Sequence, residues 1–234
     1  MPSVLLLEFE GVLVETRAMR REALASALAD EGLPSTPDAL DAAAGLPTRV
    51  AASVAAALVG HGGDETAAEL VALRAERHFA ARLGKGVSLA AGARELVSGA
   101  AGVARLGLVT RASRREVEFV LALAGLDAAF ECVVAAEDVA SPKPSPEGYR
   151  RAVERLARRR AVGAAGPGDV LALEDAAAGV RAARAAGVYC VAVGPLAAYE
   201  ALEADAAVPS LVGHTLTTLA ALVGPGAGGE AHAR

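Results

Sequence analysis

The chain of 234 residues is long enough for one large domain or for a domain with a smaller insert. It is 53% hydrophobic and 22% charged, so it can bury a sizeable core. A net charge of -5 and an aromatic content of only 3% argue against nucleic-acid binding. No apolar run approaches the roughly 20 residues of a membrane span, and no basic segment precedes the first apolar stretch. We therefore expect a soluble, cytoplasmic protein without a signal peptide.

Five apolar runs alternate along the chain with stretches rich in Ala, Leu and Arg. Continuous apolar runs are typical of parallel strands that are covered on both faces, and the segments 113–125 and 146–160 between them read as helices. Strands that alternate with helices indicate an α/β fold, a doubly wound, Rossmann-like parallel sheet. The predicted strands span residues 4–9, 104–110, 131–136, 169–174 and 188–193.

The stretch between the first two strands is far longer than the about 30 residues of a simple crossover unit. Residues 17–83 read as almost entirely helical, which predicts a small α-helical cap domain inserted after the first strand. The core domain then consists of residues 1–16 and 84–223. The Gly-rich tail, residues 224–234, has few apolar residues, and we expect it to be disordered.

Polar side chains gather at the carboxyl ends of the predicted strands. In an open parallel sheet, ligands bind outside these ends, so this edge is the candidate site. The first strand ends in Glu8 and Glu10, the second in Thr110, which Arg111 follows, and the fourth in Glu174 and Asp175, while Lys143 lies in the loop after the third.

The two acids after the first strand raise the question of what holds them together. Side chains alternate along a strand, so Glu8 and Glu10 are expected on one face, and Gly11 lets the chain turn sharply behind them. Acids held this close repel one another unless a cation lies among them. Magnesium suits such oxygen ligands and is often shared with a substrate phosphate, which Thr110 and Lys143 can hold. The alternative is that each charge is merely solvated at a strand end.

Four segments carry a family resemblance that extends from about residue 3 to 220. "EFEGVLVET", "LGLVT", "KPSPEGY" and "EDAAAGVRAARAAG" occur in this order and are similar to the four motifs of the haloacid dehalogenase superfamily. The chain most resembles the phosphatase branch with a helical cap, the group of β-phosphoglucomutase and phosphoglycolate phosphatase. The last two motifs are long and specific.

The resemblance implies a role for each matching residue. Glu8 stands where the family has its nucleophile, which attacks phosphorus and becomes a transient acyl phosphate. Glu10 stands where the family has a general acid/base. Thr110 and Lys143 correspond to the residues that hold the phosphate. Arg49, in "GLPTR", matches the cap loop that reaches the substrate.

The resemblance also implies a Mg²⁺ cofactor. Asp175, aided by Glu174, corresponds to the magnesium anchor, and Glu8 and Glu10 complete the expected ligand set. The implied substrate is a small phosphorylated metabolite, with no nucleic-acid or membrane partner. We expect a monomer or a weak homodimer.

The first motif departs from the family pattern. The family usually has Asp where this chain has Glu8, Glu10 and Glu15. Each Glu adds a methylene and moves its carboxylate by about 1 Å or more, and a misplacement of about 1 Å can cost on the order of 10²-fold in rate. Arg111 is a second departure, because it places a cation beside the phosphate site.

Three functions remain open at this point. The first is a magnesium-dependent phosphatase with a longer nucleophile. The second is a catalytically weak or inactive relative that binds a phosphorylated ligand or a protein partner. The third is other family chemistry, a mutase or a dehalogenase. The pair Glu174 and Asp175 argues against a dehalogenase, because a metal-free reaction has little use for these acids.

Overall fold

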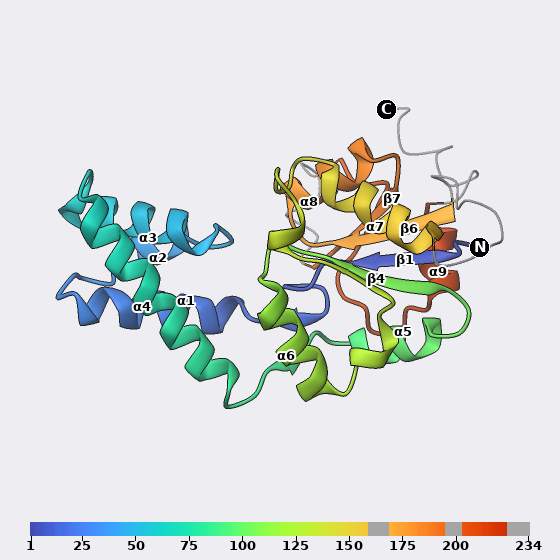
Figure 1. The fold of residues 1–234 in the computed structure, drawn as a ribbon, viewed down its shortest axis with the longest axis horizontal. Coiled ribbons are helices and arrows are strands. Elements are labelled where there is room, and N and C mark those ends of the chain that lie inside the picture. Colours follow the sequence, from blue (N-terminus) through green and yellow to red (C-terminus); the bar gives the residue numbers. More distant parts are fainter. Residues whose placement is uncertain (159–168, 195–202, 224–234) are drawn as a thin grey trace. The chain divides into compact units, whose positions relative to one another are not determined.

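The computed structural model describes residues 1–158, 169–194 and 203–223 (Figure 1). Contacts divide the chain into two compact units, one of Met1–Glu15 with Leu89–Arg234 and one of Thr16–Ser88. The first unit is an α/β unit and the second is helical. The tail that we expected to be disordered, residues 224–234, lies outside the described residues.

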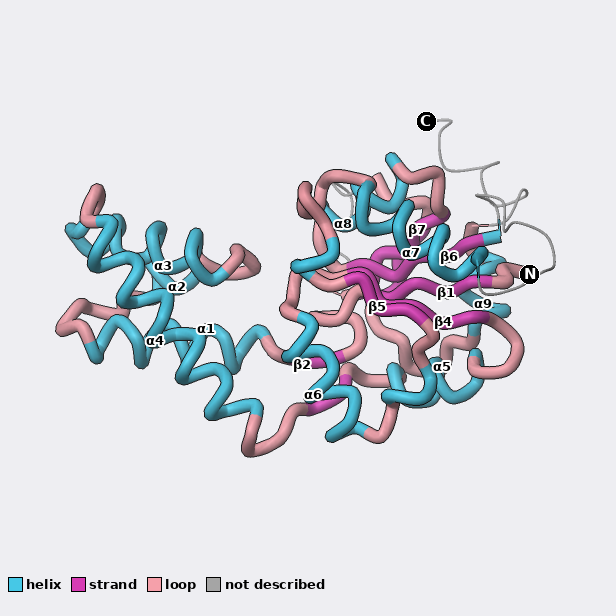
Figure 2. Tube along the Cα trace, viewed as in Figure 1, coloured by secondary structure: helices cyan, strands magenta, loops and turns pink. Residues whose placement is uncertain are grey.

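The α/β unit is built on a parallel sheet, as the alternation of apolar runs predicted (Figure 2). Across the described residues the strand order is β5-β4-β1-β6-β7-β8, which places the first strand of the chain in the middle of the sheet. Every neighbouring pair in this sheet is parallel, so the expected doubly wound, Rossmann-like fold is confirmed. The strands are β1 (Val4–Leu7), β4 (Arg105–Val109), β5 (Cys132–Val134), β6 (Val170–Glu174), β7 (Tyr189–Val193) and β8 (Ala206–Val208).

Helices cover both faces of this sheet. Helices α7 and α8 pack on one face, where they contact β4, β5, β6 and β7, whereas α5 and α9 contact each other on the other face (Figure 1). The helices of the unit are α5 (Ala93–Ala100), α6 (Arg114–Ala124), α7 (Glu147–Arg158), α8 (Ala177–Ala185) and α9 (Leu216–Ala221). Single 3₁₀ turns at Asp127–Ala129 and Ala136–Asp138 flank β5.

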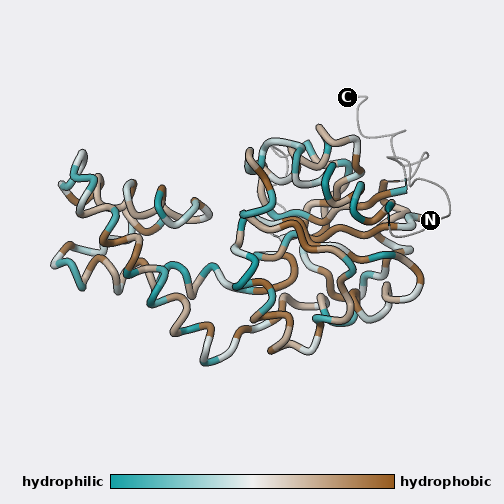
Figure 3. The backbone as a smooth tube through the Cα atoms, viewed as in Figure 1, coloured by the Kyte–Doolittle hydropathy of each residue, from teal (hydrophilic) through white to brown (hydrophobic). Residues whose placement is uncertain are grey.

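The register of the central strands fixes which side chains meet at the sheet edge. Leu7 of β1 is level with Leu108 and with Leu173. One step further along, the amide of Glu8 donates to the carbonyl of Leu173 at 3.0 Å, so Glu8 stands beside Glu174. Because side chains alternate along a strand, both acids point to the face that α7 covers, as Leu6 does. Figure 3 shows these strands as the hydrophobic centre of the unit.

Strand β1 is shorter than the apolar run predicted, and it ends at Leu7 rather than at residue 9. The carbonyl of Phe9 accepts hydrogen bonds from the amides of Leu13 and Val14, at 3.1 and 3.0 Å, which closes a tight turn. Gly11 has a φ of 79° in this turn, a conformation that residues with a Cβ rarely adopt. Strand alternation therefore does not govern Glu10, and our argument that residues 8 and 10 share a face of one strand does not hold.

Two short strands lie where the chain passes between the units. β2 (Val14–Glu15) and β3 (Ser88–Leu89) pair in a separate two-stranded sheet.

The second unit is helical throughout its regular elements. Its helices are α1 (Arg17–Asp30), α2 (Pro37–Ala42), α3 (Thr48–Ala56) and α4 (Glu65–Leu83), with a π-helical turn at Ala57–His61. Small and aliphatic side chains of all four helices, among them Leu28, Ala52 and Val71, form its core. The Arg20 guanidinium lies 3.9 Å from the ring centre of Phe79. Among the described helices, none is both long and apolar enough to cross a membrane.

Candidate active site

Glu8 is a buried acid whose two oxygens are both held. Its side chain is 9% exposed. Oε1 accepts hydrogen bonds from the amide of Phe9 at 2.9 Å and from the hydroxyl of Thr110 at 2.6 Å. Oε2 pairs with the ammonium of Lys143. A buried carboxylate with this set of donors is fixed in position at the sheet edge.

Thr110 is oriented toward Glu8 by the backbone around it. Its amide donates to the carbonyl of Val134 at 2.9 Å, which continues the pairing of β4 with β5. Its hydroxyl oxygen accepts from the amide of Ala112 at 3.1 Å, which leaves the hydroxyl proton for Glu8. A hydroxyl that follows a strand in this way can also donate to an anionic ligand.

Lys143 joins the two buried acids of the site. Its Nζ contacts Glu8, the carbonyl of Val109 at 2.7 Å and Oε1 of Glu174 at 2.5 Å. The side chain is 6% exposed, and its burial alone would lower the pKa of Lys143. The carboxylates of Glu174 and Glu8 outweigh that effect and raise the pKa of Lys143, so the amine stays charged.

The loop that carries Lys143 is shaped by Glu147 at the start of α7. The Glu147 carboxylate accepts hydrogen bonds from the amides of Ser141 at 2.9 Å and Ala140 at 3.1 Å. These two bonds lower the pKa of Glu147 and keep it charged. The loop before Lys143 is thereby tied to the helix that follows it.

Glu174 is the most deeply buried acid of the site, with a side chain 1% exposed. Its Oε1 accepts from Lys143 and from the hydroxyl of Tyr149, which is fully buried in α7. Burial raises the pKa of Glu174 to about 7, against the opposing effect of Lys143, and the charge of Glu8 adds to the rise. Burial, together with the neighbouring Glu174, raises the pKa of Tyr149 well above its usual value, so its hydroxyl remains a donor.

The structure thus brings together Glu8, Thr110, Lys143 and Glu174 of the predicted site. Arg111 directly follows Thr110 and is exposed, and Asp175 directly follows Glu174 and is half-buried. Glu10 is half-buried in the turn behind β1. Arg111 follows β4, Asp175 follows β6 and Glu10 follows β1, so all three lie at the same carboxyl-terminal edge of the sheet.

Arg49 belongs to the helical unit, where it stands in the first turn of α3. It lines a hollow of about 240 Å³ whose wall is formed by α3, the π-helical turn and the start of α4. The polar residues around this hollow are Arg49, Ser53, His61, Asp64, Glu65 and Glu69.

The acids at the sheet edge offer the oxygen ligands that Mg²⁺ prefers. The space between Glu8 and Glu174, however, is taken by the ammonium of Lys143. Within the described part of the chain, no three side chains of His, Cys, Asp or Glu lie close enough together to hold a metal ion. Glu8 and Glu174 instead share the Lys143 ammonium. By donor type the residues fit magnesium, and by position an ion has to compete with Lys143 for Glu8.

Three residues of the site were not predicted from the sequence. Tyr149 and Glu147 lie in "KPSPEGY", and Gly179 lies in "EDAAAG", so the motifs contained them without indicating a role. A Cβ on Gly179 would lie 2.0 Å from Oε2 of Glu174, so the carboxylate sits where a larger residue at position 179 would displace it. A Tyr at the buried position of an amphipathic helix is the one signal that was visible, because its hydroxyl needs a partner.

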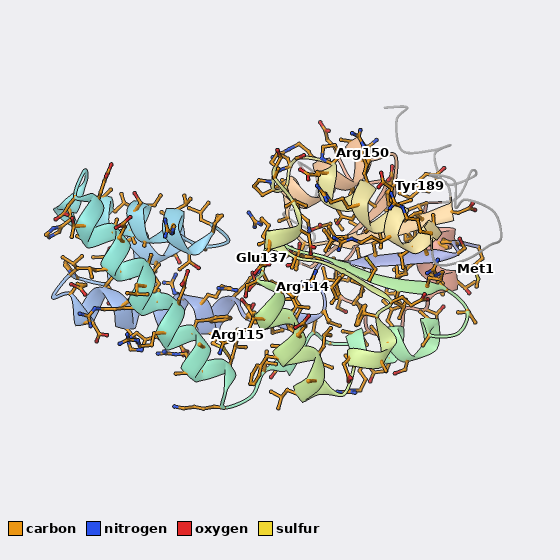
Figure 4. All side chains as sticks on the ribbon, in the orientation of Figure 1. Met1, Arg114, Arg115, Glu137, Arg150 and Tyr189 are labelled. Atoms are coloured by element: carbon orange, nitrogen blue, oxygen red, sulfur yellow. The ribbon has the colours of Figure 1, made fainter. Side chains whose placement is uncertain are left out.

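The end of β5 is fixed by an ionic cluster around Asp138. Its carboxylate accepts from the Ala135 amide and from Arg155, each at 2.8 Å, and also pairs with Arg114. The amide of Arg114 at the start of α6 donates to Glu137 at 3.0 Å, and both residues are labelled in Figure 4. Burial opposes ionisation, but Arg155, the amide and Arg114 together lower the pKa of Asp138 to about 2.

Comparison with known proteins identifies the family of the chain. Residues 5–187 match the model of the haloacid dehalogenase-like hydrolases. The chain belongs to the haloacid dehalogenase-like hydrolases. This confirms the family that the four motifs indicated, and the matched residues include Glu8, Thr110, Lys143 and Glu174.

Relatives within this hydrolase family extend over most of the chain. The chain is 32% identical over 208 residues to validoxylamine A 7'-phosphate phosphatase of Streptomyces hygroscopicus subsp. limoneus, a match that covers 88% of this chain and 92% of the relative. The crystal structure of CbbY from Rhodobacter sphaeroides in complex with phosphate is 25% identical, has a TM-score of 0.73, and covers 94% of this chain and 99% of that one. β-Phosphoglucomutase of Clostridium difficile shares the fold, with a TM-score of 0.76 at 19% identity over 94% of this chain and 96% of that one.

Proposed function

We propose that this hydrolase is a phosphatase that cleaves a small phosphate monoester through an acyl phosphate on Glu8. The observation that carries the proposal is the position of Glu8. Its buried carboxylate lies between a hydroxyl that donates at 2.6 Å and a buried ammonium, Thr110 and Lys143. A fixed anionic oxygen next to two donors for phosphate oxygens is what an in-line attack on phosphorus requires.

The proposed reaction has two steps. An oxygen of Glu8 attacks phosphorus, the bond from phosphorus to the ester oxygen breaks, and the leaving oxygen takes a proton from Glu10. Water, deprotonated by Glu10, then attacks the acyl phosphate, which releases inorganic phosphate and restores Glu8. The Glu10 role is supported by its place in the turn behind β1, two residues after Glu8.

The hydrogen bonds of the site indicate how a phosphate would bind. An ammonium has three protons, and Lys143 directs them to Glu8, the Val109 carbonyl and Glu174. Thr110 donates its only proton to Glu8. A bound phosphate therefore takes both donors over from Glu8. The exchange leaves a Glu8 oxygen free to attack at the moment that the phosphate is in place.

Mg²⁺ is part of the proposal, and members of this family generally use it. We propose that Glu8, Glu10 and Asp175 hold the ion, with Glu174 the ligand that geometry supports least, because Lys143 and Tyr149 already bind its Oε1. When bound, Mg²⁺ supplies positive charge to the phosphate oxygens. Lys143 already pairs with two of these acids, Glu8 and Glu174.

The substrate class is a small phosphorylated metabolite. The relatives support this class, since one is named as a phosphatase of validoxylamine A 7'-phosphate and a CbbY structure holds phosphate. We propose that Arg49 contacts the substrate from the helical unit and that Arg111 provides a second cation for it. We also retain as proposals a cytoplasmic location and a monomer or weak homodimer.

A second function is favoured by one observation, the additional methylene at Glu8, Glu10 and Glu15. If the longer acids misplace the attacking oxygen, the chain is a weak or inactive relative that binds a phosphorylated ligand or a protein partner. Thr110 and Lys143 would serve such a binder as well as an enzyme.

A panel of small phosphate esters distinguishes the two functions. Phosphate release by the wild type is measured with Mg²⁺ and with a chelator, next to Glu8→Gln and the matched control Glu95→Gln, an exposed position in α5. The proposal predicts Mg²⁺-dependent release by the wild type and the control, and a loss on the order of 10³-fold or more in Glu8→Gln. No release by the wild type from any ester, while an ester still binds, would establish the binding function instead.

A further inference from the structure

Tyr149 contacts both members of the buried ion pair that stands behind Glu8. Its hydroxyl donates to Oε1 of Glu174, the same oxygen that accepts from Lys143 at 2.5 Å. Its ring centre lies 5.4 Å from Nζ of Lys143, within the range of a cation–π contact. The side chain is fully buried, so both contacts are made in the interior of the unit.

The Glu174 carboxylate packs against the backbone of α8. Oε2 lies against Gly179, where a Cβ would approach it to 2.0 Å. Two donors hold Oε1, and the carboxylate as a whole lies over Gly179 in the first turn of α8. The orientation of the Glu174 carboxylate therefore rests on the two donors to Oε1, and Tyr149 is the neutral one of the two.

The orientation of Glu174 determines where the ammonium of Lys143 lies. Nζ is placed by three acceptors, Glu174, the Val109 carbonyl and Glu8. Of these, Glu8 is the group that reacts, so Glu174 and Val109 have to hold the ammonium while Glu8 changes partner. A Glu174 that turned freely would let Lys143 follow Glu8 or withdraw from it.

We propose that Tyr149 is a positioning residue, whose hydroxyl fixes Glu174 so that Glu174 presents the Lys143 ammonium to Glu8 and to the phosphate. In this proposal the role of Glu174 is to hold Lys143 and not to bind a metal ion. The catalytic consequence rests on the proposed phosphatase function, whereas the structural consequence for Lys143 does not.

The chain offers a direct spectroscopic readout of this ammonium, because it has two lysines, Lys85 and Lys143. Lys85 is exposed, whereas the Lys143 side chain is 6% exposed and has three acceptors. In protein labelled with ¹⁵N-lysine, a held ammonium exchanges its protons with water slowly and gives an NMR signal, and an exposed one exchanges fast. Lys143→Arg assigns the signal.

The test compares Tyr149→Phe with Tyr189→Phe, an exposed tyrosine at the start of β7. Tyr149→Phe keeps the ring and removes the hydroxyl. We expect proton exchange at Lys143 to rise about tenfold or more, the scale of a lost hydrogen bond to a charged group, and no change in the control. With p-nitrophenyl phosphate as substrate, we expect kcat to fall about tenfold while KM stays within about twofold.

A second pair of variants disturbs Glu174 from the opposite side. Gly179→Ala pushes the carboxylate away from α8, whereas Gly99→Ala in α5 meets nothing within 4 Å. The rate of proton exchange at Lys143 should rise in Gly179→Ala and stay unchanged in Gly99→Ala. An unchanged Lys143 signal in both Tyr149→Phe and Gly179→Ala would overturn the proposal, as would fast exchange in the wild type. Faster exchange with unchanged kcat would refute the catalytic role, and a wild type without phosphatase activity would refute the proposed function while the NMR comparison still tests the anchor.

Discussion

Glu8 carries its carboxylate one methylene further from the backbone than an aspartate would, and the structure shows where this longer side chain reaches. Its carboxylate meets the Phe9 amide, the Thr110 hydroxyl and the Lys143 ammonium at once. Two of these three donors are the groups expected to hold phosphate. The same contacts that fix this carboxylate therefore compete with a bound phosphate.

Glu8→Asp tests this competition. The shorter side chain draws the carboxylate back by about 1 Å or more, which releases the Thr110 and Lys143 donors for an anion. We expect inorganic phosphate to bind about tenfold more tightly to Glu8→Asp than to the wild type, the scale of one regained hydrogen bond to a charged group. Isothermal titration calorimetry measures the difference. Glu95→Asp is the matched control, and equal or weaker phosphate binding by Glu8→Asp would show that Glu8 does not block the phosphate donors.

At the level of elements, the carboxyl edge of the sheet depends on how its strands end. β5 is the edge strand beside β4, and Asp138 joins the turn after it to α6 and α7 through Arg114 and Arg155. The pKa of Asp138 is lowered to about 2 in the folded chain, from 3.8. A carboxyl with a lowered pKa stabilises the fold above its unfolded-state pKa, and this contribution is lost as the pH falls through about 2.

Asp138→Asn is therefore expected to lower the free energy of unfolding at pH 7 by about 1 kcal/mol, since solvent screens part of the interaction. The difference between variant and wild type should shrink between pH 4 and pH 2. Denaturant unfolding followed by circular dichroism at several pH values measures it. Asp127→Asn, at an exposed 3₁₀ turn, should match the wild type throughout. A difference that stayed constant down to pH 2 would mean that the charge of Asp138 is not what stabilises this turn.

Most strands could be predicted because their apolar runs are long enough to be distinct. The run at 104–110 exceeds β4 by one residue at each end, and the run at 169–174 exceeds β6 by one residue at its start. β8 was not predicted, because "AAV" is short and the chain is rich in Ala, which has little preference for strands. β1 ends two residues before the predicted end because backbone hydrogen bonds to the Phe9 carbonyl close a turn there. Such hydrogen bonds cannot be predicted from the hydropathy of the residues.

At the scale of the whole molecule, the sequence predicted which residues form the site. It did not predict which of their side chains contact one another. The motif order placed Glu8, Thr110, Lys143 and Glu174 at one sheet edge, because carboxyl ends of parallel strands meet there. That Lys143 binds both acids follows from the register of β1 with β6, which no single segment contains. The anchoring contact of Tyr149 could not be predicted either, since it depends on which face of α7 packs against the sheet.

The central claim is that Glu8 becomes an acyl phosphate during turnover, and trapping that intermediate tests it most directly. The wild type, mixed with the best ester of the panel, is quenched and reduced with sodium borohydride, which converts an acyl phosphate but not a free carboxylate to an alcohol. Peptide mass spectrometry then locates the reduced residue. We predict reduction at Glu8, dependent on substrate and absent in Glu8→Gln. Continued phosphate release with no reduction at Glu8, or with reduction at another acid, would contradict the account.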